Sequence, residues 1–136
     1  MPYFTKVFLL DFDAMERIIP WIIGYIPESI LQKKGEQKIE LALEELLVNM
    51  IEHAYKKQLL PVCVYVECSS TNVLIQLRDF GVLFDPLTYR QKNSPPTKIE
   101  NMVIGGQGIK FVKAVMDHLD HTYDQGMNTL TCRLCV

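Results

Sequence analysis

The sequence predicts an α/β fold, a two-layer sandwich in which one mixed β-sheet is covered on one face by about three helices. Apolar runs typical of strands lie at both ends of the chain, and runs with helical spacing lie between them. A length of 136 residues and an apolar fraction of 49% fit a globular domain with a core of its own. We therefore expect residues 1–136 to form a single domain.

The first half of the chain predicts a strand followed by two helices. Residues 3–10 have a strand pattern, and Asp11 or Asp13 is a candidate cap for the helix that follows. Pro20 lies inside this helix and is expected to bend it or end it early. The second helix has the longest helical pattern of the chain, over residues 32–58.

The second half predicts two hairpins that are separated by an irregular segment and a third helix. The polar residues 69–72 predict a short connection between two strands. A stretch with several prolines, approximately residues 86–105, continues neither a helix nor a central strand and is a candidate lid. His118 and His121 are expected near the end of the third helix, where a cation is favourable. The expected elements are strands over residues 62–68 and 73–78, a helix over residues 109–118 and a closing hairpin that turns at Gln125–Gly126.

The second helix carries a polar stripe, because Glu45, Asn49 and His53 follow one another at spacings of four. Residues four apart lie on one face of a helix, so these side chains face one pocket. A carboxylate accepts a proton, and an amide oxygen is a ligand for a hard cation such as Mg²⁺. We therefore expect a base, Glu45, beside a metal ligand, Asn49. His53 either orients its neighbours or is a satisfied structural histidine.

Two further stretches have the chemistry of nucleotide binding. Asp79 closes a strand of branched apolar residues, and a partly buried carboxylate needs a donor such as the exocyclic amino group of a purine. Gly81 lets a flat ring approach the backbone. Gly105, Gly106 and Gly108 lie at the start of the third helix, where free amide groups and the positive end of the helix dipole bind phosphate.

Each stretch also has a more ordinary interpretation. A Glu/Asn pair at helical spacing is often a solvated face, Asp before Gly often caps a turn, and a glycine doublet is often only a turn. Their order and spacing along one chain favour the nucleotide site.

The three stretches together resemble the N, G1 and G2 boxes of the GHKL ATPase superfamily, which is shared by gyrase, Hsp90, histidine kinases and MutL. Within that superfamily the pattern is most similar to the small anti-sigma-factor serine/threonine kinases, and the resemblance covers nearly the whole chain. The residues that carry it are Glu45, Asn49, His53, Ala54, Tyr55, Asp79, Gly81, Phe84, Asp85, Pro86, Gly105, Gly106, Gly108 and Ile109.

The resemblance implies a Bergerat-type fold with ATP bound between the helices and the lid. It also implies that Glu45 is the catalytic base for phosphoryl transfer, with Mg²⁺ at Asn49. The candidate nucleotide-binding residues are Asn49, His53, Asp79, Gly81, Phe84, Gly105, Gly106, Gln107, Gly108, Ile109 and Lys110. Further candidate donors to the phosphates, in addition to Lys110, are the lid residues Arg90, Lys92 and Lys98.

Two features depart from the superfamily pattern. Leu83 stands two residues after Gly81, where many members have a second glycine, so the backbone has less freedom there. The stretch over residues 87–104 is short and lacks the long glycine-rich lid of histidine kinases. The departures concern the contacts between lid and phosphates rather than the Glu45, Asn49 and Asp79 positions.

The resemblance implies an ATP-dependent protein serine/threonine kinase that acts as an anti-sigma factor. The expected partners are a sigma factor and a STAS-type antagonist, which is phosphorylated on serine or threonine, and the expected assembly is a homodimer. Two alternatives stay open. One is a non-catalytic module that uses nucleotide to choose its partners. The other is a detached histidine-kinase ATPase domain, which has to act on another chain because no histidine precedes Glu45.

Composition argues against several other classes. A formal net charge of −2 provides no basic surface for nucleic acid. The most apolar stretch, residues 18–26, is too short to cross a bilayer, and the first residues lack a secretory signal, so we expect a cytoplasmic protein without membrane contact. Cys132 and Cys135 have the spacing of half a zinc site, but in a strand they point to opposite faces. The cysteines are expected to be small core residues in a reducing compartment.

Overall fold

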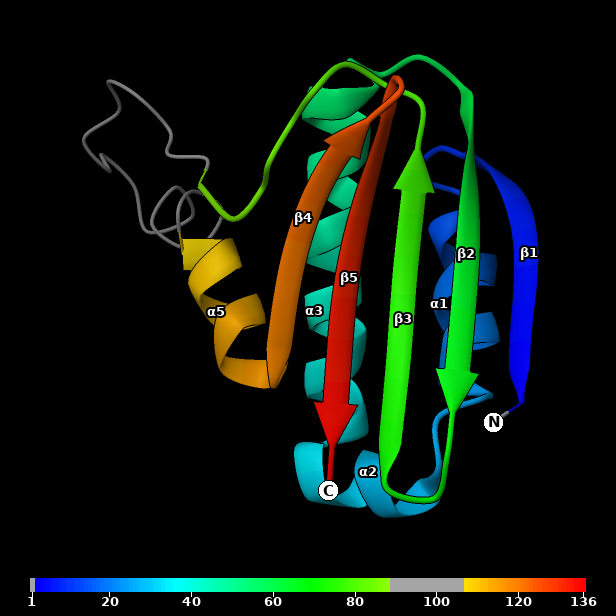
Figure 1. Cartoon of the computed structure of the whole chain (residues 1–136), viewed down its shortest axis with the longest axis vertical. Helices are drawn as coiled ribbons and strands as arrows, with labels where there is room; N and C mark the ends of the chain where they lie inside the picture. Colours follow the sequence, from blue (N-terminus) through cyan, green and yellow to red (C-terminus); the bar gives the residue numbers. More distant parts are fainter. Residues whose placement is uncertain (1, 89–106) are drawn as a thin grey trace.

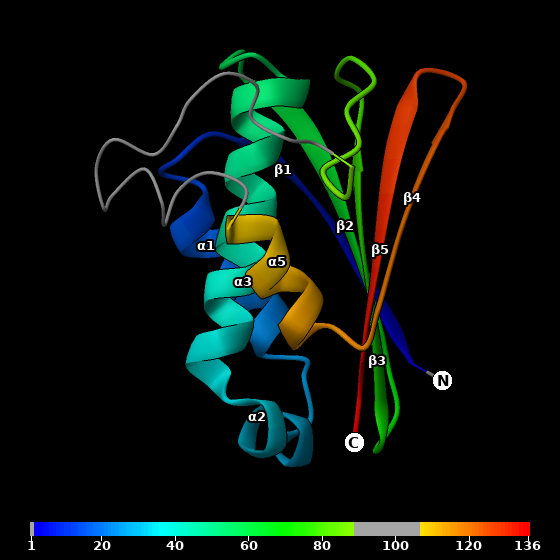
Figure 2. The same cartoon turned by 90° about the vertical axis from the view of Figure 1, so that its left-hand side faces the viewer.

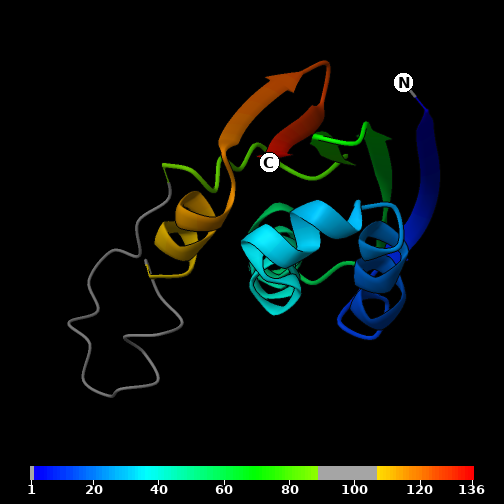
Figure 3. The ribbon, with the colours of Figure 1, turned by 90° about the horizontal axis from the view of Figure 1, so that it is seen from below.

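The protein is described by a computed structural model that covers residues 2–88 and 107–136. Figures 1 and 2 show two layers, a five-stranded sheet and a layer of helices that covers one face of it. Seen from below in Figure 3, the helices lie on one side of the strands. The prediction of a two-layer α/β sandwich is confirmed.

The strands are β1 (Tyr3–Leu10), β2 (Leu60–Cys68), β3 (Asn72–Asp79), β4 (His118–Asp124) and β5 (Met127–Cys135). They form one sheet in the order β1-β2-β3-β5-β4, and every neighbouring pair is antiparallel. The prediction of a mixed sheet is therefore wrong. Strands β3 and β4 run in the same direction, but the closing hairpin places β5 between them, so these two strands never pair.

The helical layer contains α1 (Met15–Ile23), α2 (Glu28–Lys34), α3 (Glu36–Asn49) and α5 (Gln107–Val115). A single π-helical turn, η1 (Met50–Ala54), continues α3. The long helix expected over residues 32–58 is divided in the structure, because Gly35 has a φ of +91° between α2 and α3. Glycine adopts this conformation without a steric penalty, so it ends one helix and lets the next begin in a new direction.

Helix α1 continues through Pro20 to Ile23, so the expectation that Pro20 ends it early is wrong. Pro20 is exposed, and its ring and missing N–H group therefore lie outside the core. Of the two candidate caps, Asp11 accepts a hydrogen bond from the Ala14 N–H at 2.7 Å in the turn ahead of the helix.

The third predicted helix is α5, which begins and ends earlier than expected. His118 and His121 consequently lie in strand β4 and not at a helix end. The chain enters the sheet at this point because the Asp117 carboxylate is held by Lys34 Nζ at 2.8 Å and by the Cys135 N–H at 2.8 Å. The hairpin between β4 and β5 turns at Gln125 and Gly126, both with positive φ, as predicted.

Strands β3 and β5 alternate strictly between a buried face toward the helices and a less buried outer face. Their buried rows are Val73, Ile75, Leu77 and Asp79 in β3 and Asn128, Leu130, Cys132 and Leu134 in β5. Each row has its polar residue at the same end of the sheet, because Asp79 and Asn128 are register partners. Two buried polar groups at one end of an apolar core mark the candidate site.

The four cysteines are free thiols. Cys132 lies in the core as expected, and burial raises the pKa of its thiol to about 12, which makes it a poor nucleophile. Cys63, Cys68 and Cys135 are half-buried. Within residues 2–88 and 107–136 no group of three His, Cys, Asp or Glu side chains is arranged to hold a metal ion. None of the described helices is long and apolar enough to cross a membrane.

Candidate functional site

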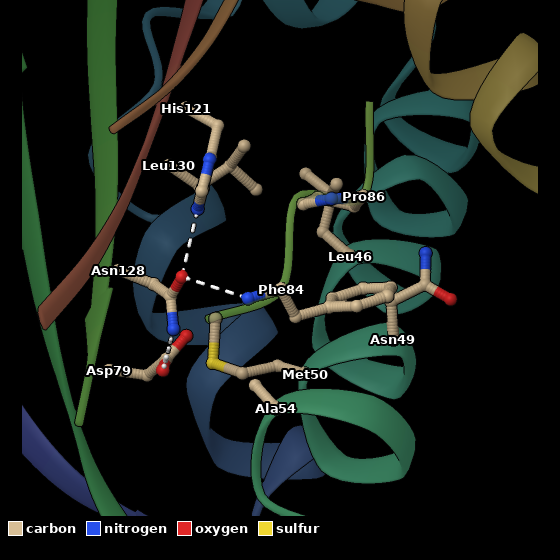
Figure 4. Close-up of a pocket in the computed structure, with 10 residues that line it drawn as sticks. All are labelled: Leu46, Asn49, Met50, Ala54, Asp79, Phe84, Pro86, His121, Asn128 and Leu130. Carbon is tan, nitrogen blue, oxygen red and sulfur yellow. Dashed lines mark hydrogen bonds between the residues drawn. The ribbon is translucent and has the colours of Figure 1, made fainter. Parts of the chain in front are cut away.

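The site is built around the Asp79 carboxylate at the end of β3 (Figure 4). Asp79 is only 3% exposed. Its Oδ1 atom accepts hydrogen bonds from the Gly81 N–H and from Asn128 Nδ2, each at 2.9 Å. Both of these bonds use Oδ1, so Oδ2 is the oxygen that remains for an external donor such as a purine amino group.

The environment of Asp79 opposes its negative charge. Burial raises the pKa of the carboxyl, while the hydrogen bonds from Asn128 and Gly81 and the nearby His121 act in the opposite direction, and the net direction is upward. A carboxylate that stays buried in this way is a functional-site candidate, because it gains from a further donor.

The structure requires glycine at position 81 for a reason that differs from the predicted one. A Cβ atom on Gly81 would lie 2.3 Å from the Ala54 carbonyl oxygen and 2.6 Å from a ring carbon of Tyr55. The glycine therefore lets the turn after β3 dock on the end of η1, and this docking is completed by the Val82 N–H, which donates to the same Ala54 oxygen at 3.0 Å. The Tyr55 hydroxyl donates to the Pro61 carbonyl and accepts from the Phe80 N–H at 3.3 Å.

Helix α3 presents Glu45 and Asn49 to the same region. Asn49 Nδ2 donates to Glu45 Oε1 at 3.4 Å, and the neighbouring Glu44 is exposed while Glu45 is half-buried. Burial raises the pKa of the Glu45 carboxyl, the bond from Asn49 lowers it and the charge of Glu44 raises it, with a net upward shift. A raised pKa brings the carboxyl closer to the operating range of a general base.

Helix α5 covers this carboxylate through Gly108. A Cβ atom on Gly108 would lie 2.0 Å from Glu45 Oε1 and 2.2 Å from Glu45 Cδ, so the carboxylate occupies the space where a side chain would project. Helix α5 therefore approaches Glu45 closely enough that only a glycine fits at this position. The start of α5, where phosphate groups are expected, and the candidate base are thus neighbours.

The donor set around Glu45 fits a magnesium-bound phosphate. The Asn49 amide uses its Nδ2 atom toward Glu45, which leaves Oδ1, the atom that a hard cation takes. Asn49 is half-buried, so its side chain is not sealed inside the core. No pair of carboxylates competes for the role of metal ligand among the residues of the pocket in Figure 4.

Phe84 fills much of the pocket. Its ring stacks on His53 with a centroid distance of 4.7 Å and an interplanar angle of 25°. Figure 4 shows the ring extending from the loop after β3 toward the helix that carries Asn49. The cavity that remains is about 10 Å³, roughly the space of one water, whereas pockets for organic ligands are about 300–1,000 Å³. The cavity is therefore too small for a purine in this conformation, and Phe84 is one of the side chains that fill it.

Two polar residues of the pocket were missed in the sequence, Asn128 and His121. Asn128 is 2% exposed, and its amide bonds to Asp79, Val82, Phe84 and His121. Asn128 could have been predicted from the turn at Gln125–Gly126, which sets the strand register. That register makes Asn128 the one polar side chain in the buried row of β5. His121 carried no such signal.

The remaining predicted residues are placed as follows. Gln107 begins α5, Ile109 packs partly against the core, and Lys110 is exposed. Gly105 and Gly106 lie outside the described residues, as do the lid candidates Arg90, Lys92 and Lys98 and most of the predicted lid. The described part of the site brings together Glu45, Asn49, His53, Asp79, Gly81, Phe84 and Gly108.

Curated proteins similar to this chain are serine-protein kinases named RsbW. Those of Bacillus cereus (strain AH820) and Bacillus anthracis (strain A0248) are each 26% identical over 97 residues, and that of Bacillus thuringiensis (strain Al Hakam) is 25% identical. Each match covers 69% of this chain and 61% of the relative, so it spans less than two thirds of the relatives' length.

Solved structures resemble the fold. The RsbU and RsbW domains of a Mycobacterium tuberculosis protein align with a TM-score of 0.60 at 14% identity, over 98% of this chain and 32% of that chain. The Acinetobacter baumannii histidine kinase AdeS aligns with a TM-score of 0.50 at 12% identity, over 96% of this chain and 67% of that chain. Identities this low concern the fold alone.

A family model, the histidine kinase-like ATPase domain, matches residues 14–134. That range contains every candidate site residue from Glu45 to Lys110. With its two-layer α/β fold and a site assembled from α3, the turn after β3 and α5, the chain belongs to the histidine kinase-like ATPase domain family.

Proposed function

We propose that this chain is an ATP-dependent protein serine/threonine kinase that acts as an anti-sigma factor and phosphorylates a STAS-type antagonist. The observation that carries the proposal is Glu45: a half-buried carboxyl with a raised pKa, hydrogen-bonded by Asn49 and covered by Gly108 at the start of α5. A pocket that only bound a nucleotide would not need a base at this position. The similarity to serine-protein kinases supports the same reaction.

In the proposed reaction Asp79 selects the nucleotide by accepting a hydrogen bond from the purine amino group. The segment from Gly105 to Gly108 donates backbone N–H groups to the phosphates, and Lys110 adds a positive charge. Asn49 Oδ1 would hold a magnesium ion, which would neutralise part of the phosphate charge. Glu45 takes the proton of the serine or threonine hydroxyl as its oxygen attacks the γ-phosphorus. The bond from that phosphorus to the β–γ bridging oxygen breaks, and ADP leaves with the bonding electron pair.

The proposed partners are the STAS-type antagonist and a sigma factor, and the proposed assembly is a homodimer in the cytoplasm. The similarity to the RsbW proteins supports this choice of partners. Residues 1–136 are proposed to act as one ATP-binding domain whose lid lies at about residues 86–105.

One observation favours the second candidate, a nucleotide-controlled binding module without phosphotransfer. The cavity beside Asp79 is only about 10 Å³, so nucleotide entry has to enlarge the pocket that Phe84 lines. A ligand that binds one conformation better shifts the equilibrium toward it without any chemistry. The position of Glu45 beside Gly108 argues for the kinase instead.

The test combines calorimetry of ATP and ADP in the presence of Mg²⁺ with transfer of radiolabel from ATP to a STAS protein. Wild type, Asp79→Asn and Glu45→Ala are compared, and Glu44→Ala is the matched control because Glu44 is the exposed neighbour of Glu45. The kinase is supported if Asp79→Asn does not bind, Glu45→Ala binds without transferring label, and Glu44→Ala does both. If wild type binds nucleotide but transfers no label, the binding module is supported. If wild type binds no nucleotide, both proposed functions are excluded.

A further inference from the structure

Asn128 connects three parts of the pocket through one amide group. Its Nδ2 atom donates to Asp79 Oδ1 at 2.9 Å and to the Val82 carbonyl at 2.9 Å. Its Oδ1 atom accepts from the Phe84 N–H at 3.2 Å and lies 2.9 Å from His121 Nε2. All four hydrogen-bonding positions of the amide are in use. Figure 4 shows the bonds from Asn128 to Asp79, Phe84 and His121.

The backbone fixes the orientation of this amide. The Phe84 N–H is always a donor, so the atom it meets is the amide oxygen; the Val82 carbonyl is always an acceptor, so the atom it meets is the amide nitrogen. The contact between Asn128 Oδ1 and His121 therefore requires that Nε2 of His121 carries a proton. The hydrogen-bond network therefore places a proton on Nε2 of the imidazole ring.

His121 also lies against the segment that carries Phe84. Its side chain is 6% exposed, and Nδ1 is 3.8 Å from Asp85 Oδ2. The other oxygen of Asp85 accepts from the Leu87 N–H at 2.9 Å and shapes the turn after Phe84. One buried ring thus contacts both the residue that holds Asp79 and the residue that follows Phe84.

We propose that His121 is a positioning residue of the nucleotide pocket, which holds the Asp79 carboxylate through Asn128. The inference rests on the proposed nucleotide binding for its functional consequence. Without the Nε2 donor, Asn128 Oδ1 loses one of its two partners, and the amide that orients Asp79 is less constrained. The Asp79 carboxylate then meets the purine in several orientations instead of one, and affinity falls.

The experiment compares His121→Ala, His121→Gln and His118→Ala. Glutamine places an amide N–H close to where Nε2 stands, so His121→Gln keeps the donor to Asn128. His118 is the matched control, because it is exposed and lies on the same strand but on the opposite face from His121. The ADP dissociation constant with Mg²⁺ is expected to rise about five- to tenfold in His121→Ala, and to stay within about twofold of wild type in the other two variants.

A second readout does not need nucleotide. In the nucleotide-free protein, long-range ¹H–¹⁵N spectra are expected to show a proton on Nε2 of His121, and the side-chain amide signals of Asn128 are expected to move in His121→Ala and to return toward wild type in His121→Gln. The proposal is overturned if Nε2 of His121 carries no proton. It is also overturned if the side-chain amide signals of Asn128 are unchanged in His121→Ala. So does an unchanged ADP affinity in His121→Ala when wild type binds. If wild type binds no nucleotide, the proposed function fails, and the spectra still decide whether His121 orients Asn128.

Discussion

At the residue scale, Asp79 is a buried carboxyl group whose burial does not stabilise the folded chain. Its carboxyl is buried, and its pKa lies above the ordinary value of 3.8, because burial outweighs the donors Asn128 and Gly81. The charged form is therefore less favourable in the folded chain than in water. A buried carboxyl of this kind is understandable if its free oxygen serves a ligand.

We predict that Asp79→Asn loses nucleotide binding without losing stability. An asparagine Oδ1 accepts the same two hydrogen bonds from Gly81 and Asn128, but its Nδ2 group cannot accept from a purine amino group. The expected free energy of unfolding at pH 7 equals that of wild type or exceeds it by up to about 1 kcal/mol. Urea unfolding and ADP calorimetry measure the two quantities. A variant that is clearly less stable would contradict this account of Asp79.

Glu45 and Gly108 are two residues of the site that lie directly against each other. We predict that Gly108→Ala displaces the Glu45 carboxylate, because the added Cβ would lie 2.0 Å from Oε1, and lowers phosphotransfer about tenfold or more. ADP affinity is expected to change much less. The measurement is label transfer in Gly108→Ala, in Glu45→Ala and in the double variant.

The double variant distinguishes a specific effect from damage to α5. If Gly108 acts through Glu45, the double variant transfers label as slowly as Glu45→Ala alone, because the two changes remove one interaction. If the effects multiply, Gly108 acts by another route and the account of this pair is wrong.

The break between α2 and α3 is a feature of the element scale. The periodicity over residues 32–58 is continuous enough to predict one helix, and the chain nevertheless turns at Gly35. Glu45 on α3 then meets Gly108 of α5, and Asn49 lines the pocket at the end of the sheet. Figure 2 shows α2 lying across the start of α3. The direction of α3 is set by this glycine.

We predict that Gly35→Ala lowers the free energy of unfolding by about 1–2 kcal/mol, because the φ of +91° is strained for any residue with a Cβ atom. Gly24→Ala is the matched control: Gly24 has a φ of −61° at the end of α1, and an added Cβ would lie no closer than 3.4 Å to its neighbours. Urea unfolding compares the two. Equal effects would show that the Gly35 conformation adapts to a side chain.

At the scale of the whole molecule, the buried carboxyls at the site couple stability to pH. The folded pKa values of Asp79 and Glu45 lie above their ordinary values of 3.8 and 4.5, with burial as the first cause. A carboxyl with a raised folded pKa contributes stability that is fully present below its unfolded pKa and is lost as the pH rises through the folded pKa. Asp117 behaves in the opposite way: burial alone raises its pKa, but the bonds from Lys34 and the Cys135 N–H lower it overall.

We predict that the free energy of unfolding of wild type falls, relative to that of the double variant Asp79→Asn/Glu45→Gln, as the pH rises from about 4.5 toward 7. The contribution of Asp117 changes only below its unfolded value of 3.8, outside this window, and is shared by both proteins. Urea unfolding at a series of pH values measures the difference. Parallel curves for the two proteins would mean that neither carboxyl is perturbed in the folded chain.

Local patterns in the sequence determined the layers and several of the site residues. Strand alternation, the polar connection after β2 and the turn at Gln125–Gly126 depend on neighbours within a few residues, and the structure has them as predicted. The helical spacing of Glu45 and Asn49 likewise places both on one face of α3, where they hydrogen-bond. Short-range geometry of this kind can be predicted from the sequence, because it depends only on residues close together in the chain.

Only the tertiary structure decided the features that depend on distant segments. The sheet is antiparallel because the closing hairpin inserts β5 beside β3, and no periodicity reveals strand order. Gly81 makes room for η1, and Gly108 makes room for Glu45, contacts that join residues far apart in the sequence. His121 belongs to the site because the register of β4 with β5 pairs it with Leu130, and it reaches Asn128 diagonally across the hairpin. Such contacts arise from packing, which couples segments whose local sequences are independent of one another.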